Sequence, residues 1–250
     1  MSEQVQLFKI KTKAKGFKAI AAALSSFLDE ATITFTPEAL KIGLLDASRK
    51  EGLYLTWTKE KFEQYEVSKE MQLTFYVNSL IAIFKRFSVD EDVMIDSTTR
   101  GTVLFTQPKT EKQFDCHLIN NNTPSEKPMN VAYVGKFNMI ISQLEEMISD
   151  SEVFEAEEAW FESEGSKLVF KGKGDAGVTT GILIREYNQE IKNTAFRFEY
   201  LKPFLQSMKP YVKEEIVVQI GPQKPLHLTL DLGEEIGMME YFLAPKYEAE

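Results

Sequence analysis

The chain has 250 residues, of which 43% are hydrophobic and 27% charged, so its composition allows a large core and is not that of a disordered protein. Its 29 basic and 38 acidic side chains give a net charge of −9, which by itself argues against a nucleic-acid binder. The single cysteine, Cys116, excludes an internal disulfide framework, and no apolar run is typical of a signal peptide or a membrane span. We therefore expect a protein of the cytoplasm, or of the nucleus if its source is eukaryotic.

The first predicted element is a helix over residues 15–28, where Phe17, Ile20 and Leu24 recur on one helical face. A second helix is predicted over residues 75–87, and an acidic turn follows it. Two helices are therefore expected in the first half of the chain.

Both helices have a copy in the second half. Residues 136–149 repeat the first apolar pattern at an offset of 120, and residues 199–211 repeat the second at an offset of 124. Two matches in the same order indicate a duplicated domain.

Runs that alternate or are rich in β-branched and aromatic residues predict strands between the helices. They cover residues 31–35, 52–57, 93–95, 102–106, 113–119, 158–163, 167–171, 180–185, 216–220, 226–231 and 239–243. The fold class expected is α+β, with two tandem similar domains that each hold two helices and antiparallel sheets. The polar segment 120–128, with two prolines, is predicted to connect a domain at 1–119 to a domain at 129–250.

Cations gather on the predicted helices although the chain is acidic overall, which indicates a local positive face on a negative body. The alternative for any single lysine is the solvated face of an amphipathic helix. Because no recognition-helix signature occurs, binding to DNA should be directed at the backbone and indifferent to sequence. The candidate DNA-facing residues are Lys15, Lys18, Lys85, Arg86, Lys136, Lys202 and Lys209.

No catalytic chemistry is visible in the sequence. There are two histidines, and Cys116 and His117 are neighbours on a predicted strand, so their side chains should point to opposite faces. No phosphate-binding, zinc or redox motif occurs. We predict no catalytic residue, cofactor or metal. An α+β enzyme whose site cannot be recognised from the sequence is kept as an alternative.

Three motifs carry a family resemblance. The ending Glu240-Tyr241-Phe242-Leu243-Ala244-Pro245-Lys246, the segment Leu44-Leu45-Asp46-Ala47-Ser48-Arg49 and the pair Phe62 and Tyr65 resemble the proliferating cell nuclear antigen family, the sliding clamps of eukaryotes and archaea. The resemblance implies the DNA clamp fold, with three subunits head to tail in a ring and the helices lining a central hole.

The function that the resemblance implies is that of a non-enzymatic processivity factor, which encircles duplex DNA without sequence preference. The implied partners are DNA polymerase, the clamp loader, flap endonuclease and ligase, each bound through a short peptide motif, and no membrane is expected. The alternative within this class is a divergent subunit of a heterotrimeric or checkpoint ring.

The resemblance also implies two contact surfaces. The subunit interface would pair residues 113–119 with 178–184 of a neighbour by β-augmentation, through Phe114, Cys116, Leu118, Thr180 and Ile182. The partner-peptide pocket would hold Leu45, Lys50, Gly52, Pro225, Phe242, Ala244 and Pro245. Lys50 and Gly52 depart from the apolar side chains that the family places there, so we expect weaker or differently shaped peptide binding.

Overall fold

The computed structural model describes residues 8–97, 101–120, 125–187, 189–192, 195–212 and 215–246. The chain forms two compact units, each assembled from three stretches of sequence. Unit 1 comprises Met1–Leu44, Leu53–Lys127 and Leu232–Met239, and unit 2 comprises Leu45–Gly52, Pro128–Asp231 and Glu240–Glu250. Among the described residues, no helix is long and apolar enough to cross a membrane.

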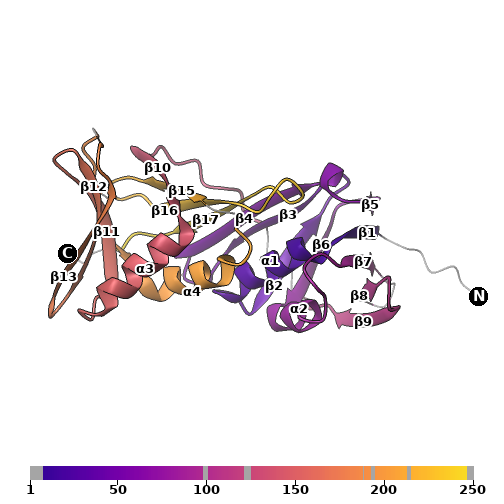
Figure 1. The fold of residues 1–250 in the computed structure, drawn as a ribbon. Coiled ribbons are helices and arrows are strands. Elements are labelled where there is room, and N and C mark those ends of the chain that lie inside the picture. The colour runs from indigo at the N-terminus through magenta and orange to yellow at the C-terminus, as the bar shows by residue number, and fades with distance from the viewer. Residues whose placement is uncertain are drawn as a thin grey trace, which may run out of the picture. The chain divides into compact units, whose positions relative to one another are not determined.

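Unit 1 contains two helices and two antiparallel sheets (Figure 1). One sheet has the strand order β5-β1-β7-β8-β9, and the other contains the run β4-β3-β2-β6. The elements are β1 (Phe8–Lys13), α1 (Ala14–Ser25), β2 (Glu30–Phe35), β3 (Ala39–Leu45), β4 (Glu51–Thr58), the 3-10 helix η1 (Lys59–Lys61), β5 (Gln64–Val67), β6 (Met71–Tyr76), α2 (Val77–Phe84), β7 (Asp92–Ser97), β8 (Thr102–Gln107) and β9 (Lys112–His117).

The core of unit 1 is aromatic. Phe17 of α1 stacks on Phe84 of α2, with ring centroids 5.4 Å apart, and also contacts Trp57 of β4 at 5.4 Å. A Cβ atom on Gly16 would lie 2.2 Å from the Trp57 ring, so only glycine allows α1 to lie this close to the sheet. The apolar stripe of α1 is thus buried against the sheet and against α2.

Unit 2 repeats this arrangement. Its elements are β10 (Gly135–Ile140), α3 (Ile141–Glu152), β11 (Glu158–Glu164), β12 (Lys167–Gly174), β13 (Gly177–Ile184), β14 (Phe196–Arg197), α4 (Phe198–Met208), β15 (Glu215–Ile220), β16 (Leu226–Asp231) and β17 (Met238–Leu243). One sheet has the order β13-β12-β11-β14, and another contains the run β10-β15-β16-β17. Phe161 contacts Phe137, Phe170 and Phe196 in the core, with centroids 5.4–5.6 Å apart.

The predicted α+β class and the duplication are confirmed, but the alignment of the repeat was wrong. Helices α1 and α3 begin at residues 14 and 141, which is an offset of 141 − 14 = 127 and not 120. Phe137 lies on β10 because residues 135–140 alternate strictly between buried and exposed side chains, which is the period of a strand. The helical spacing of Phe137, Ile140 and Ile141 is a coincidence. Phe137 and Ile140 lie on β10, and Ile141 is the first residue of α3.

The predicted strands are present, but several of their bounds differ from the prediction. Strand β9 ends at His117 and does not reach Ile119, whose backbone N–H instead donates to the carbonyl of Thr74 at 2.9 Å. Strands β1, β3, β5, β6, β10 and β14 were not predicted. Most of them are short or adjoin a helix, so their apolar residues merge with the neighbouring helical pattern.

Part of the predicted connector, residues 121–124, lies outside the described residues. Just after it, the Glu126 N–H donates to the carbonyl of Gly43 on β3 at 2.8 Å. A Cβ atom on Gly43 would lie 2.0 Å from the Glu126 carbonyl oxygen, so glycine is required for this approach. The division into domains at 1–119 and 129–250 stays a prediction.

Candidate functional site

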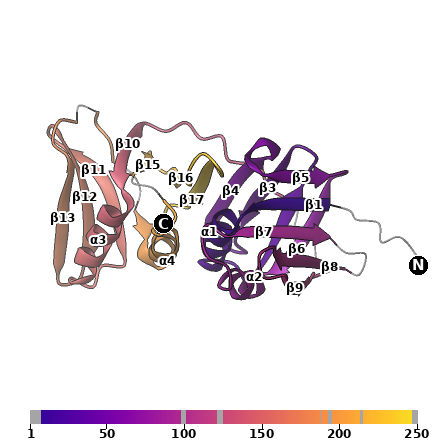
Figure 2. The same ribbon diagram turned by 45° about the vertical axis from the view of Figure 1, so that its right-hand side comes forward.

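Helix α1 carries Lys15 and Lys18, Lys85 and Arg86 follow α2, and neither helix contains an acidic residue. Lys15 is half-buried on α1, and Lys85 and Arg86 are exposed where α2 ends. The exposed pair borders a shallow hollow on α2 formed with Asn78, Ile81 and Ala82. Helices α1 and α2 lie side by side (Figure 2). Cations on α1 and just past α2, with no acidic residue on either helix, can attract a polyanion.

Lys18 has a structural task on the same helix pair. Its ammonium group donates hydrogen bonds to the backbone carbonyls of Phe84 at 2.9 Å and Phe87 at 2.7 Å, at the C-terminal end of α2. The Phe84 carbonyl also accepts the N–H of Phe87 at 3.2 Å, and a cation at this end interacts favourably with the helix dipole. Lys18 therefore ties α1 to α2, and its charge is largely used within the fold.

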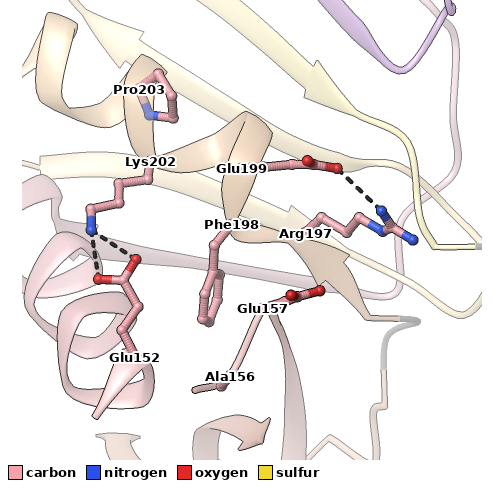
Figure 3. A pocket seen from close by; sticks show the side chains of 8 residues that line it. All are labelled: Glu152, Ala156, Glu157, Arg197, Phe198, Glu199, Lys202 and Pro203. Atoms are coloured by element: carbon pink, nitrogen blue, oxygen red, sulfur yellow. Dashed lines mark hydrogen bonds and ion pairs between the residues drawn. The ribbon is translucent and has the colours of Figure 1, made fainter. Parts of the chain in front are cut away.

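The helices of unit 2 are electrostatically different. Helix α3 carries Glu145, Glu146, Asp150 and Glu152 and no cation. Lys202 of α4 pairs with Glu152, with 2.5 Å between the nearest atoms, and Lys209 pairs with Glu145 at 2.7 Å. A hollow of about 350 Å³ where α3 ends and α4 begins is lined by the Lys202–Glu152 and Arg197–Glu199 pairs (Figure 3). The cations predicted on α4 are thus neutralised locally.

Lys136 was predicted to lie on a helix, and this is wrong. It is an exposed residue of β10, opposite Gln219 of β15, because the helix begins only at Ile141. The cationic helix face of unit 2 is therefore reduced to Lys202 and Lys209.

Strands β9 and β13 are the outermost strands of their sheets, β9 in unit 1 and β13 in unit 2. Each is paired on one side only among the described residues. On β13, Val178, Thr180 and Ile182 alternate as exposed side chains, and Val178 and Ile182 are 52% and 40% exposed. Exposed apolar side chains on an unpaired edge favour pairing with another strand.

The candidates on β9 are less accessible. Phe114 is half-buried and contacts the ring of Phe87 at 5.8 Å, and Cys116 is 4% exposed. Burial raises the pKa of the Cys116 thiol to about 11, so it is protonated at neutral pH. Leu118 lies just past the strand and donates its N–H to Gly101 at 3.2 Å. The edge of β9 would thus offer mainly its backbone groups to a partner strand.

A cleft of about 390 Å³ in unit 2 lies beside Lys50. Three of the predicted pocket residues line it, namely Lys50, Ala244 and Pro245. The other lining residues were not predicted as pocket residues: Ser48, Arg49, Arg197, Tyr200 and Lys246. Ser48, Arg49 and Lys246 are within two of the three motifs quoted above, but only tertiary structure brings Arg197 and Tyr200 to them.

The other predicted pocket residues are not part of the lining. Gly52 and Phe242 are buried, and Leu45 and Pro225 are half-buried. Phe242 stacks on His227, with ring centroids 4.1 Å apart. Burial lowers the pKa of His227 to about 4, so the ring is neutral at pH 7 although its Nε2 atom lies 3.0 Å from a carboxylate oxygen of Glu240.

Asp46 builds the loop that presents Lys50. Its carboxylate accepts N–H groups of Ser48 at 3.0 Å, Lys50 at 2.6 Å and Glu51 at 2.7 Å. Partial burial acts to raise the pKa of Asp46, but these hydrogen bonds outweigh it and lower the pKa. The Ala244 N–H also donates to the Lys50 carbonyl at 2.7 Å, which fixes the backbone of the loop.

Glu51 follows on β4 and is 4% exposed. Burial raises its pKa to about 7, although Tyr241 donates a hydrogen bond to Oε1 at 2.7 Å. Tyr241 is itself fully enclosed and stacks on Phe204 with centroids 3.8 Å apart. A buried carboxyl group whose pKa is raised to about 7 therefore lies inside unit 2, next in sequence to the cleft residue Lys50.

Residues 7–127 match the sequence pattern of the family described as "Proliferating cell nuclear antigen, N-terminal domain". The chain is 22% identical to a DNA polymerase sliding clamp of Methanothermobacter thermautotrophicus, over 91% of this chain and 93% of that protein. The fold is similar to that of "A. fulgidus PCNA" bound to the C-terminal region of FEN-1, with a TM-score of 0.84, 19% identity and coverage of 97% of this chain and 100% of that chain. It is also similar to a chain of the PCNA2-PCNA3 complex from Sulfolobus tokodaii, with a TM-score of 0.81, 23% identity and coverage of 96% and 100%.

Proposed function

Because the chain belongs to the proliferating cell nuclear antigen family of DNA sliding clamps, we propose that it encircles duplex DNA as a ring and acts as a processivity factor. The observation that carries this proposal is that α1 and the residues just past α2 carry cations, with no acidic residue on either helix, on a chain whose net charge is −9. Such cations attract the DNA backbone, while the acidic remainder limits binding elsewhere. No catalytic step of its own is needed for this role.

The ring would form from head-to-tail contacts between β9 of one subunit and β13 of the next. A heterologous contact of this kind closes into a ring when its rotation allows. The exposed Val178 and Ile182 on the edge strand β13 support the proposal. Each subunit would supply two similar domains, at 1–119 and 129–250, so three subunits would give a sixfold repeat around the hole.

The DNA-facing surface would be carried mainly by unit 1. Lys15, Lys85 and Arg86 stand on helices without acidic residues, whereas Lys202 and Lys209 are paired with carboxylates. Lys18 would contribute little directly, because it caps α2. Contacts to the DNA backbone do not select a base sequence, as a protein that slides along DNA requires.

The partners would be DNA polymerase, the clamp loader, flap endonuclease and ligase, each bound through a short peptide. The relative bound to FEN-1 supports this partner class. The peptide surface would include the cleft lined by Lys50, Ala244 and Pro245. The protein would work in the compartment that holds the DNA, which is the cytoplasm, or the nucleus if the source is eukaryotic.

Two measurements test the proposed function. Sedimentation equilibrium of the purified chain should give the mass of a trimer, and primer extension with the polymerase of the same source should become longer when the chain is loaded. A chain that stays monomeric alone but forms a ring with a sister subunit would instead be one member of a heterotrimer, as the PCNA2-PCNA3 relative suggests. A chain that neither assembles nor lengthens the products would contradict the proposal.

A further inference from the structure

Every charged residue that lines the cleft beside Lys50 is a cation. Arg49 and Lys50 come from the loop before β4, Arg197 precedes α4, and Lys246 follows β17. No carboxylate is part of the described lining. Three segments far apart in the sequence thus bring four positive charges together on a chain whose net charge is −9.

Nearby acids balance part of this charge but leave Lys50 without a carboxylate partner in the described contacts. Glu199 pairs with Arg197 at 3.2 Å, and Glu158 pairs with Lys246 at 2.6 Å. The Lys50 ammonium group instead donates a hydrogen bond to the hydroxyl oxygen of Tyr200 at 2.6 Å. The negative charge of Glu199 also acts on Lys50, but no described ion pair engages the ammonium group. An anionic group entering the cleft could therefore pair with Lys50 directly.

The geometry of Lys50 is also fixed before any ligand binds. The loop backbone is held by the Asp46 carboxylate and by the Ala244 N–H, and the ammonium lies 4.8 Å from the centroid of the Tyr200 ring. Fixing a long side chain in advance lowers the entropy lost on binding. Tyr200, Ala244 and Pro245 add an aromatic and apolar wall beside the charges.

Building on the proposed function, we propose that this cleft selects partner peptides that carry acidic residues beside their aromatic anchor. The anchor would contact Tyr200 and Pro245, and a Glu or Asp side chain would reach Lys50 and Arg197. A cleft of about 390 Å³ accommodates a few side chains of a peptide but not a nucleic-acid duplex. Lys50 then determines which peptides bind, and its effect is more than the loss of an apolar side chain from the pocket.

The test uses the intact protein and three labelled peptides that share one aromatic anchor sequence and differ only in their flanking residues, which are Glu, Gln or Lys. Fluorescence anisotropy at low salt should rank them Glu, Gln, Lys, with the Glu peptide binding roughly tenfold tighter than the Gln peptide. The gap should shrink at high salt, because screening weakens exposed ion pairs.

Lys50→Met retains the aliphatic stem and removes the charge, so it should reduce the affinity difference between the Glu and Gln peptides several-fold. Arg197→Met removes a charge from another segment of the cleft and should reduce this affinity difference independently. Lys173→Met, at an exposed lysine of β12, is the matched control and should leave the gap unchanged. Circular dichroism and sedimentation of each variant establish that the fold and the assembly are intact.

The remaining outcomes separate the two proposals. If all three peptides bind equally well, the selection of acidic partners is wrong while the peptide-binding function stands. If none binds, the proposed peptide-binding function itself fails at this cleft. If a single-stranded oligonucleotide binds and Lys50→Met abolishes that binding while the peptides are unaffected, the cleft is a phosphate site and the inference is overturned.

Discussion

At the scale of the residue, Glu51 gives the protein a pH-dependent stability. Its carboxyl has a pKa of about 7 in the folded protein against 4.5 as the ordinary value, so the folded state holds the proton more tightly. The stabilisation is therefore fully present below pH 4.5 and is lost as the pH rises through about 7. This direction is opposite to that of a carboxylate in an ion pair.

We expect Glu51→Gln to flatten this dependence, because glutamine can still accept the Tyr241 hydroxyl and cannot ionise. Between pH 5.5 and 8.5 the wild type should lose on the order of 2 kcal/mol relative to the variant in the free energy of unfolding. Urea unfolding at both pH values measures this loss. Glu30→Gln, at an exposed carboxyl, is the control and should run parallel to the wild type. Parallel curves for Glu51→Gln would show that Glu51 does not titrate in this range.

Lys18 is the second residue whose role differs from expectation. We expect Lys18→Met to lower the free energy of unfolding by about 1–2 kcal/mol, since two backbone carbonyls at the end of α2 lose a charged donor. Lys85→Met, an exposed lysine on the same helix pair, should change stability by less than about 0.5 kcal/mol. Thermal or urea unfolding measures the stability of both variants. If both are equally stable, water replaces the Lys18 ammonium group at the two carbonyls without a loss of stability.

At the scale of the element, the two helix pairs differ in charge although they repeat the same architecture. Helices α1 and α2 carry no acidic residue, whereas α3 carries four. If DNA faces the helices, the contacts should be concentrated on unit 1.

We expect Lys85→Gln combined with Arg86→Gln to weaken binding of a linear duplex roughly three- to tenfold at low salt, and to flatten its salt dependence. Lys202→Gln combined with Lys209→Gln removes the same formal charge and should weaken binding less, because both ammonium groups are already paired. Anisotropy titrations over a range of salt concentrations measure both. The reverse order of effects would place the DNA contacts on unit 2.

At the scale of the whole molecule, assembly should depend on the edge of β13. Val178→Glu combined with Ile182→Glu replaces exposed apolar side chains by carboxylates that a buried interface would have to desolvate. We expect monomers by sedimentation velocity, while circular dichroism stays unchanged. Val153→Glu is the control, since Val153 is 75% exposed at the end of α3 and lies outside β13. A double variant that stays trimeric would exclude this edge from the interface.

This variant tests the interface more cleanly than a change at Phe114. The Phe114 ring contacts Phe87 inside unit 1, so a charge there would also disturb the core. Loss of the trimer would then have two explanations.

The sequence by itself determined the α+β class, the duplication, most of the strands and the family, because alternation, helical spacing and the C-terminal motif are local patterns. It misplaced the start of α3, since the Phe137 to Ile140 stretch satisfies a helical and a strand spacing together and only sheet pairing with β15 decides between them. The tertiary structure alone decided which cations are free to act. Lys18, Lys202 and Lys209 look alike in the sequence, but their partners lie 50 to 69 residues away. The same reason explains the cleft, because Lys50 and Tyr200 are separated by 150 residues and meet only through packing.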